Sequence, residues 1–201
     1  MKIKDLMIPN PITVTDKASV EDAIELMKVN SIRPLPVVSR ANKLKGFVTL
    51  ADLKQGLIPS MLGDLTIADL MIKKPITVSP DDDIEIAAQL IYRHKIGGMP
   101  VMKRNKVVGI ITESDILRAF IDMMGILTAS SRIDVVVGET PGSLKRAFHV
   151  IHDQGAEIIN VGVTAERARK GTYYFRLSPC KTKTIKNALE REGFEVVAAM
   201  D

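Results

Sequence analysis

The chain has 201 residues, enough for two compact domains or one large one, and its 46% apolar and 26% charged residues exclude the disordered and fibrous classes. The formal net charge of +4 is small, aromatic residues make up 4%, and Trp is absent; we therefore expect no nucleic-acid partner, because such binders concentrate basic charge and stacking aromatics. No apolar run approaches the length of a membrane span, the first residues lack a signal-peptide core, and the single Cys180 fits a reducing compartment, so we expect a cytoplasmic protein without membrane contact.

The chain begins with an internal repeat. The segment IKDLMIPNPITVT at 3–15 recurs as IADLMIKKPITVS at 67–79, an offset of 64 residues. Residues 55–64, QGLIPSMLGD, contain Gly, Pro and Ser and are expected to connect the two copies. This repeat predicts one domain at 1–63 and a second at 64–128.

The pattern within each copy predicts the element order β-α-β-β-α. The ITV triplets at 12–14 and 76–78 are expected to be short strands, and helices capped by Ser19 and Asp83 follow them. Two further strands and a second helix complete each copy. Since so small a unit cannot cover both faces of its sheet, we expect the two copies to share a core. Apolar spacing predicts the buried helix faces as Val20, Ala23, Ile24 and Met27, and as Ile84, Ala87, Ala88 and Ile91.

The spacing Gly-x-x-Thr-x-x-Asp stands where the last strand of each copy meets its last helix. A helix N-terminus offers unpaired N–H groups and the positive end of the helix dipole, which favour phosphate. The threonine hydroxyl can add a donor, the glycine leaves room for a ligand near the backbone, and the two aspartate oxygens can accept from adjacent ribose hydroxyls. The alternative is structural, since Thr-x-x-Asp is close to a capping box and glycine can mark a bulge. The residues concerned are Gly46, Thr49 and Asp52, and Gly109, Thr112 and Asp115.

The doubled order of DLM, PITV, PV and GxxTxxD resembles a tandem pair of cystathionine beta-synthase (CBS) domains, the Bateman module, over residues 1–125. The resemblance implies a regulatory module that binds adenosine ligands in clefts between the repeats. It implies that the motif threonine contacts phosphate and the motif aspartate holds the ribose. It also implies that residues of PITV border the adenine and that residues before PV line the cleft. The nucleotide-binding residues so implied are Thr49, Asp52, Thr112 and Asp115, with Gly46 and Gly109 beside them, and Ile12, Thr13, Ile76, Thr77, Arg33 and Gly98.

Residues 129–201 have a different pattern. Their strand-helix-strand-strand-helix-strand order predicts a ferredoxin-like sandwich. The TPGSL turn before the first helix resembles the PG-x-L turn of ACT domains, small-molecule sensing modules that usually pair, and implies an effector turn at Glu139, Pro141 and Gly142. Glu139 stands where that family often has Asp. The alternative is that Pro141 and Gly142 only shape the start of the helix. The expected fold class is α+β, with two CBS repeats packed as a pair and followed by an ACT-like domain.

Two CBS repeats followed by an ACT-like domain resemble the acetoin-utilization family. The resemblance implies a non-catalytic regulator connected with acetoin or related carbon metabolism. An enzyme acting directly in acetoin metabolism and a transcription regulator acting through a partner are the alternatives, although the chain offers no Ser-His-Asp, Cys-His, P-loop or zinc pattern. His149 and His152 are expected to be surface residues, and no metal site is expected.

The expected ligand is AMP, ADP or ATP, with S-adenosylmethionine or NAD less favoured, because cations that strengthen phosphate binding are expected near the clefts. These cations are Arg33, Lys73, Lys74, Lys106 and Arg118. The predicted helix 114–124 is also rich in apolar residues. We therefore expect a homodimer that covers them: Ile116, Leu117, Phe120, Ile121, Met123 and Met124.

Overall fold

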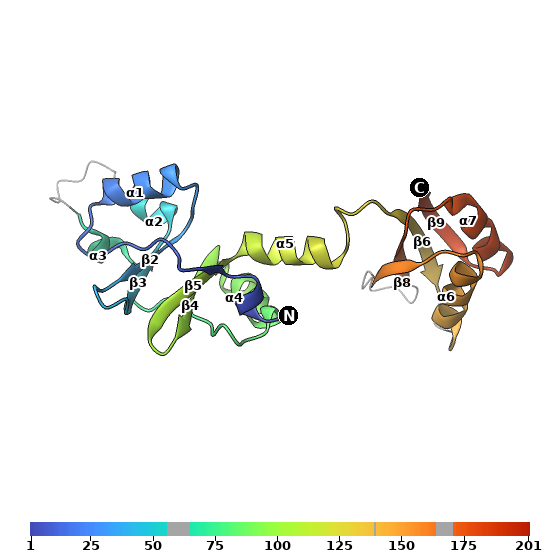
Figure 1. Ribbon diagram of the computed structural model, residues 1–201, viewed down its shortest axis with the longest axis horizontal. Coiled ribbons are helices and arrows are strands. Elements are labelled where there is room, and N and C mark those ends of the chain that lie inside the picture. The colour runs from blue at the N-terminus through green and yellow to red at the C-terminus, as the bar shows by residue number, and fades with distance from the viewer. Residues whose placement is uncertain (56–64, 139, 164–170) are drawn as a thin grey trace. The chain divides into compact units, whose positions relative to one another are not determined.

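The computed structural model describes residues 1–55, 65–138, 140–163 and 171–201, which form two compact units (Figure 1). Unit 1 comprises Met1–Arg118 and unit 2 comprises Ala119–Asp201, so the division falls within helix α5 (Glu113–Met123). Glu139 and nearly all of the expected connector lie outside the described residues. Among the helices of the described part, none is long and apolar enough to cross a membrane.

Unit 1 is built from short helices and antiparallel hairpins. The hairpins pair β2 (Leu35–Val38) with β3 (Leu44–Val48) and β4 (Gly98–Lys103) with β5 (Lys106–Thr112). Each ITV triplet forms a single parallel bridge, Val14 to Val37 and Val78 to Val101, so the strand predicted at each triplet is reduced to one residue. The elements are η1 (Ile3–Asp5), β1 (Ile8–Pro9), α1 (Val20–Val29), β2 (Leu35–Val38), β3 (Leu44–Val48), α2 (Leu50–Gln55), α3 (Ile67–Leu70), α4 (Ile84–His94), β4 (Gly98–Lys103), β5 (Lys106–Thr112) and the first part of α5.

The helix faces predicted from apolar spacing agree with the structure. All four predicted residues of α1 are buried and pack with Leu35, Val37 and Leu53 in one cluster. In α4, Ile84 and Ala87 are buried, and the other two predicted residues are half-buried. Local periodicity was sufficient for α1 because this helix buries one stripe against the hairpin of its own repeat.

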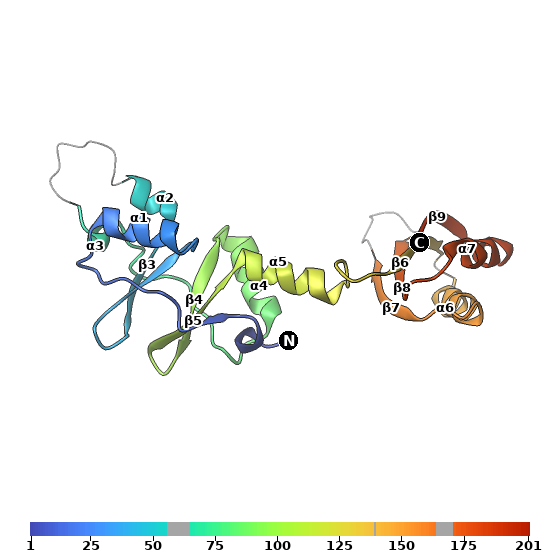
Figure 2. The same cartoon turned by 45° about the horizontal axis from the view of Figure 1, so that its top comes forward.

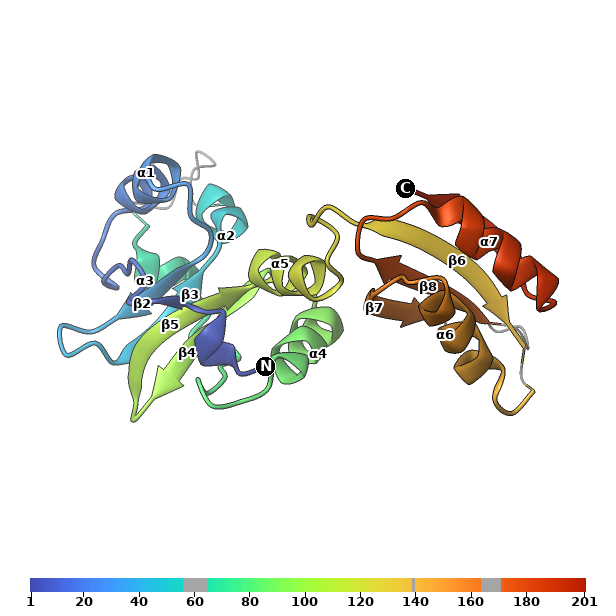
Figure 3. The same ribbon diagram turned by 45° about the vertical axis from the view of Figure 1, so that its right-hand side comes forward.

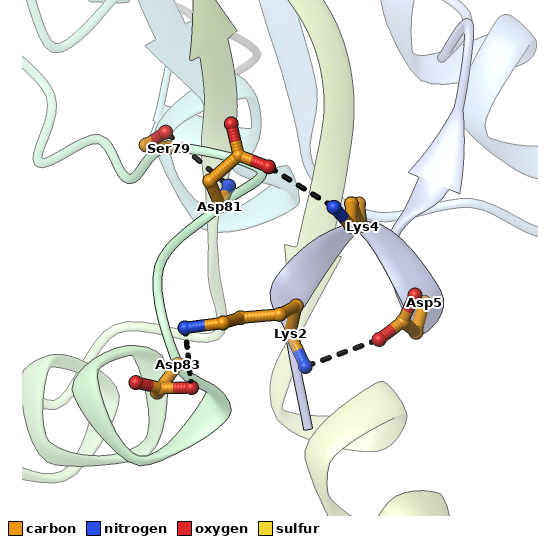
Figure 4. Close-up of polar contacts among 6 residues, drawn as sticks. All are labelled: Lys2, Lys4, Asp5, Ser79, Asp81 and Asp83. Atoms are coloured by element: carbon orange, nitrogen blue, oxygen red, sulfur yellow. Dashed lines mark hydrogen bonds and ion pairs between the residues drawn. The ribbon is translucent and has the colours of Figure 1, made fainter.

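The helices α1 and α4 begin at equivalent positions but are capped differently. Ser19 Oγ accepts a hydrogen bond from the Asp22 N–H at 3.0 Å, which confirms the cap predicted for α1. Asp83 occupies the N-cap of α4 without a cap hydrogen bond, and its carboxylate lies 2.9 Å from Lys2 Nζ (Figure 4). The hydrogen bond between them raises the pKa of Lys2 and lowers the pKa of Asp83. The N-cap position predicted at Asp83 is confirmed, but its carboxylate makes no cap hydrogen bond and pairs with the cation of Lys2.

The segment that precedes α1 and the matching segment that precedes α4 each cross onto the other repeat. We call residues 8–12 and 72–76 the leading segments. In the first, β1 pairs antiparallel with β5, which gives the sheet order β1-β5-β4 (Figure 3). In the second, Ile72 forms an antiparallel bridge with Phe47 of β3. The two repeats are thus joined by exchanged segments.

The motif glycines lie under these segments. A Cβ on Gly46 would lie 2.5 Å from Met71 Sδ and 3.0 Å from the Ile72 carbonyl oxygen, and a Cβ on Gly109 would lie 2.5 Å from Met7 Sδ. Both methionines belong to the DLM triplets, so the DLM methionine of one repeat packs on the motif glycine of the other. The role expected for these glycines, leaving room for a ligand, is corrected: a methionine side chain fills that room.

Unit 2 is one antiparallel sheet with two helices on one face. The strand order is β7 (Ile158–Val163), β8 (Gly171–Leu177), β6 (Ser131–Val137), β9 (Glu195–Met200). The helices α6 (Ser143–Asp153) and α7 (Thr182–Arg191) both lie on the same side of the sheet (Figures 2 and 3). Apolar residues of the strands and both helices form its core, among them Ile133, Phe175, Ile151 and Leu189. After the end of α5, the described elements are β6 (Ser131–Val137), α6 (Ser143–Asp153), β7 (Ile158–Val163), β8 (Gly171–Leu177), α7 (Thr182–Arg191) and β9 (Glu195–Met200).

The last residue of the sequence caps helix α7. Asp201 Oδ1 accepts hydrogen bonds from the Thr182 N–H at 2.7 Å and from its hydroxyl at 2.6 Å. These bonds hold the pKa of Asp201 below its usual range. The carboxylate thereby satisfies one of the unpaired donors at the start of the helix.

Candidate functional site

Two clefts in unit 1 each join the Thr-x-x-Asp motif of one repeat to the leading segment of the other. The first, which we call the Asp115 cleft, has a volume of about 330 Å³. Thr112 and Asp115 come from the β5–α5 junction, Ile12 from the first leading segment, and Arg33 from the stretch before β2. The remaining lining residues are Ile8, Asn10, Pro11, Ser31, Ile32, Pro34, Ile110 and Ser114.

The second, the Asp52 cleft, is larger, with a volume of about 490 Å³. Thr49 and Asp52 come from the β3–α2 junction, Ile76 from the second leading segment, and Gly98 from the start of β4. The remaining lining residues are Phe47, Ile72, Lys74, Pro75, His94, Lys95, Ile96 and Gly97.

A third hollow of about 530 Å³ adjoins both clefts. It shares Arg33 and Thr112 with the Asp115 cleft, and Thr49 and Gly97 with the Asp52 cleft. A ligand group that leaves either cleft past its motif threonine would therefore enter this common hollow.

The Thr-x-x-Asp motif has the same geometry in both clefts. Asp52 Oδ2 accepts hydrogen bonds from the Thr49 N–H at 2.8 Å and from its hydroxyl at 2.7 Å, and Asp115 accepts from Thr112 at the same distances. The motif thus forms a capping box in both copies, but only one oxygen of each carboxylate takes part in it. The other oxygen, Oδ1, makes no hydrogen bond with any residue in the described part of the chain, and it remains an acceptor for a ligand in the cleft.

A third copy of the Gly-x-x-Thr-x-x-Asp spacing in the chain shows that the motif alone does not make a cleft. It consists of Gly63, which lies outside the described residues, and of Thr66 and Asp69. Asp69 Oδ2 accepts from the Thr66 N–H at 2.9 Å and from its hydroxyl at 2.7 Å, and these bonds lower the pKa of Asp69. Neither Thr66 nor Asp69 lines any of the three hollows.

Most of the implied site residues line one of the two clefts, and four of them do not. Thr13 and Thr77 do not line either cleft, and the motif glycines contact methionines. Of the expected cations, Arg33 and Lys74 line a cleft, whereas Lys73, Lys106 and Arg118 do not. Further polar lining residues were not expected from the sequence, among them Asn10, Ser31 and Lys95. The 64-residue offset pairs Asn10 with the expected Lys74, and Ser31 with Lys95.

In unit 2, the implied effector turn leads into α6. Gly142 is the N-cap of that helix, with φ of 88°, a backbone conformation that favours glycine. Pro141 and Gly142 are exposed. His149 and His152 line a separate surface hollow beside Phe148, and no group of potential metal ligands occurs in the part of the chain that the structure describes.

Comparison with known proteins gives both a family and named relatives. The family model of the CBS domain matches twice, at residues 3–58 and 67–122. The chain is 37% identical over 114 residues to a homoserine O-acetyltransferase of Methanocorpusculum labreanum, a match that covers 56% of this chain and 23% of that relative. The chain thus spans less than a quarter of the length of the curated relatives that it matches.

Three solved structures are similar to about 60% of the chain. An acetoin utilization protein (AcuB) from Vibrio cholerae is 31% identical with a TM-score of 0.57, over 63% of this chain and 94% of that chain. The CBS domain pair of MJ0100, in complex with 5′-methylthioadenosine and S-adenosyl-L-methionine, is 30% identical with a TM-score of 0.56, over 60% and 99%. A structure of CBSX2, a CBS-pair protein from Arabidopsis thaliana, in complex with AMP is 31% identical with a TM-score of 0.54. The match covers 60% of this chain and 96% of that chain.

Proposed function

The chain belongs to the CBS-domain family, and on that premise we propose that it is a non-catalytic regulatory protein that senses adenine nucleotides in the Asp52 and Asp115 clefts. AMP, ADP or ATP is the regulatory ligand. No cofactor takes part.

One observation carries this proposal: each cleft contains a carboxylate whose Oδ2 holds the helix start while its Oδ1 has no partner among the described residues. A ribose presents two adjacent hydroxyls that suit such an acceptor. An isoleucine and a proline of the leading segment line the same cleft and suit the apolar faces of adenine, Ile12 with Pro11 and Ile76 with Pro75. Each cleft thus combines an acceptor for the ribose with an apolar surface for the adenine, and its volume suits a small ligand.

The similar structures support an adenosine ligand. One CBS pair at 30% identity holds 5′-methylthioadenosine and S-adenosyl-L-methionine, and another at 31% holds AMP. For this chain we favour a ligand with phosphate over one with a sulfonium group, because the cations Arg33, Lys74 and Lys95 line the clefts. A cation attracts the negative phosphate and repels the positive sulfonium.

The test is calorimetry of the full chain with AMP, ADP, ATP and S-adenosylmethionine, with differential scanning fluorimetry as a second readout. We expect at least one of the three nucleotides to bind more tightly than S-adenosylmethionine and to raise the melting temperature more. Tighter binding of S-adenosylmethionine than of all three nucleotides would contradict the preference. Turnover of acetoin by the pure protein would contradict the non-catalytic role.

We further propose a fold family for unit 2, a metabolic role and a dimeric assembly. The β-α-β-β-α-β order of residues 129–201, with its strand order β7-β8-β6-β9, supports an ACT-like, ferredoxin-like domain with its effector turn at Pro141 and Gly142. Likeness to AcuB over unit 1 supports a role in acetoin or related carbon metabolism, in the cytoplasm, through a regulated partner protein. The CBS repeats at 1–63 and 64–128 would form a homodimer through the exposed apolar residues of α5.

A further inference from the structure

The two clefts differ in charge at positions that match across the repeat. At the 64-residue offset, Asn10 of the Asp115 cleft corresponds to Lys74 of the Asp52 cleft, and Ser31 corresponds to Lys95. At one matching position the charge is instead in the Asp115 cleft, where Arg33 corresponds to Gly97 of the Asp52 cleft. The Asp52 cleft therefore has two lysines against one aspartate, and the Asp115 cleft has one arginine against one aspartate.

The difference lies in the side chains and not in the backbone. Ser31 and Lys95 have the same φ of 52°, and they follow the matching helices α1 and α4. Exchanging their side chains therefore imposes no new backbone conformation on either site. The first cleft presents a hydroxyl where the second presents an ammonium group.

The lysines of the Asp52 cleft are available to a ligand. Neither Lys74 nor Lys95 forms an ion pair or hydrogen bond with a residue in the described ranges, whereas Lys2, Lys4 and Lys45 are paired with aspartates. Asp52 is the one carboxylate among the described lining residues, and its Oδ2 is occupied by Thr49. His94 lines the cleft beside them. This cleft is also the larger of the two, about 490 against 330 Å³.

From these differences we infer that the Asp52 cleft selects adenine nucleotides with two or three phosphates, while the Asp115 cleft takes adenosine compounds with one phosphate or none. Lys74 and Lys95 determine this specificity. An additional phosphate brings more negative charge, and two unpaired ammonium groups stabilise that charge far more than an amide and a hydroxyl do. The inference rests on the proposed function, since it assigns a ligand class to each of the same two clefts.

The experiment compares ATP with adenosine as ligands of the full chain, by calorimetry at low ionic strength. The main variant, Lys74→Asn with Lys95→Ser, places the residues of the Asp115 cleft in the Asp52 cleft. We expect it to bind ATP at this cleft about 25-fold more weakly, at roughly fivefold per lysine, with little change for adenosine. Two controls accompany it. Lys73→Asn removes an adjacent exposed lysine that lines neither cleft and should preserve ATP affinity. Lys74→Arg with Lys95→Arg keeps both charges and should preserve the preference for ATP.

The outcomes separate the two proposals. A wild-type chain that binds no adenine nucleotide overturns the proposed function and this inference together. A wild type that binds ATP, with a folded Lys74→Asn, Lys95→Ser variant that retains the same ratio of ATP to adenosine affinity, overturns this inference alone. A loss of ATP affinity in the Lys73→Asn control equal to that of the main variant also overturns it, because the effect would then be one of overall charge. Rising salt should reduce the ATP affinity of the wild type more than that of the main variant.

Discussion

Removing the carboxylates of Asp52 and Asp115 separates the two tasks that the structure gives them. In each, Oδ2 accepts two hydrogen bonds from the motif threonine, and Oδ1 has no partner among the described residues. Asp52→Ala or Asp115→Ala removes the carboxylate half of a capping box, which costs about 1 kcal/mol of unfolding free energy. It also leaves two ribose hydroxyls without a charged acceptor, so we expect that cleft to lose about 1.5–3 kcal/mol of binding free energy, roughly ten- to a hundredfold in affinity.

Asparagine at the same positions distinguishes these effects. Its side chain keeps one acceptor oxygen, which can cap the helix nearly as well as aspartate does. The second oxygen becomes an NH₂ group, and the charge is lost. Asp52→Asn and Asp115→Asn should therefore retain most of the wild-type stability, while nucleotide affinity still falls by about tenfold at the altered cleft.

The chain supplies its own control in Asp69, whose contacts with Thr66 match those of the two cleft aspartates. Because Asp69 lines none of the hollows, Asp69→Ala should lower stability and leave nucleotide affinity unchanged. The assays are urea unfolding followed by circular dichroism, and calorimetric titration with nucleotide. A folded Asp52→Ala, Asp115→Ala double variant that binds like wild type would refute the reasoning. So would an Asp69→Ala variant whose affinity falls as far as that of the cleft variants.

Three further predictions concern packing, pH and association. Gly46→Ala should lower the unfolding free energy by about 1–3 kcal/mol, since its Cβ would overlap Met71, and adding Met71→Ala should recover part of the loss in the double-mutant cycle. Because the pKa of Asp201 is lowered in the folded protein, its carboxylate stabilises the fold above about pH 3.8, the ordinary pKa of aspartate. The wild type should lose this stability as the pH falls below that value. Asp201→Asn should show a weaker acid dependence of the melting temperature. Light scattering should give about twice the 22.1 kDa chain mass, and Leu117→Glu, which charges a side chain that is 61% exposed on α5, should shift that mass toward the monomer; a monomeric wild type would contradict the dimer.

The sequence was most informative where structure depends on neighbours in the chain. The buried stripe of α1 follows from apolar residues three and four positions apart, and Ser19 caps that helix through a residue three positions later. Asp83 has the same local signal, yet its carboxylate pairs with Lys2, which is 81 positions away. No local rule predicts that competition, because it depends on how the N-terminal segment crosses the second repeat.

The candidate site shows the same limit. A Thr-x-x-Asp motif caps a helix wherever it occurs, and Thr66 and Asp69 have nearly the same hydrogen bonds as Thr49 and Asp52. What distinguishes the cleft copies is the leading segment that lies across each of them. That feature comes from long-range pairing, such as Ile72 with Phe47, which a single sequence does not reveal.

The exchanged segments explain why the motif occurs in a duplicated unit. The glycine of one repeat accommodates the DLM methionine of the other, and the threonine and aspartate of one repeat face the isoleucine and proline that follow that methionine. Each repeat therefore supplies half of each cleft, and a single repeat could form neither. Because every cleft contains residues of both repeats, a ligand bound in one contacts both copies at once. Its binding free energy is then also free energy that holds the pair together, which is the coupling that a sensor needs.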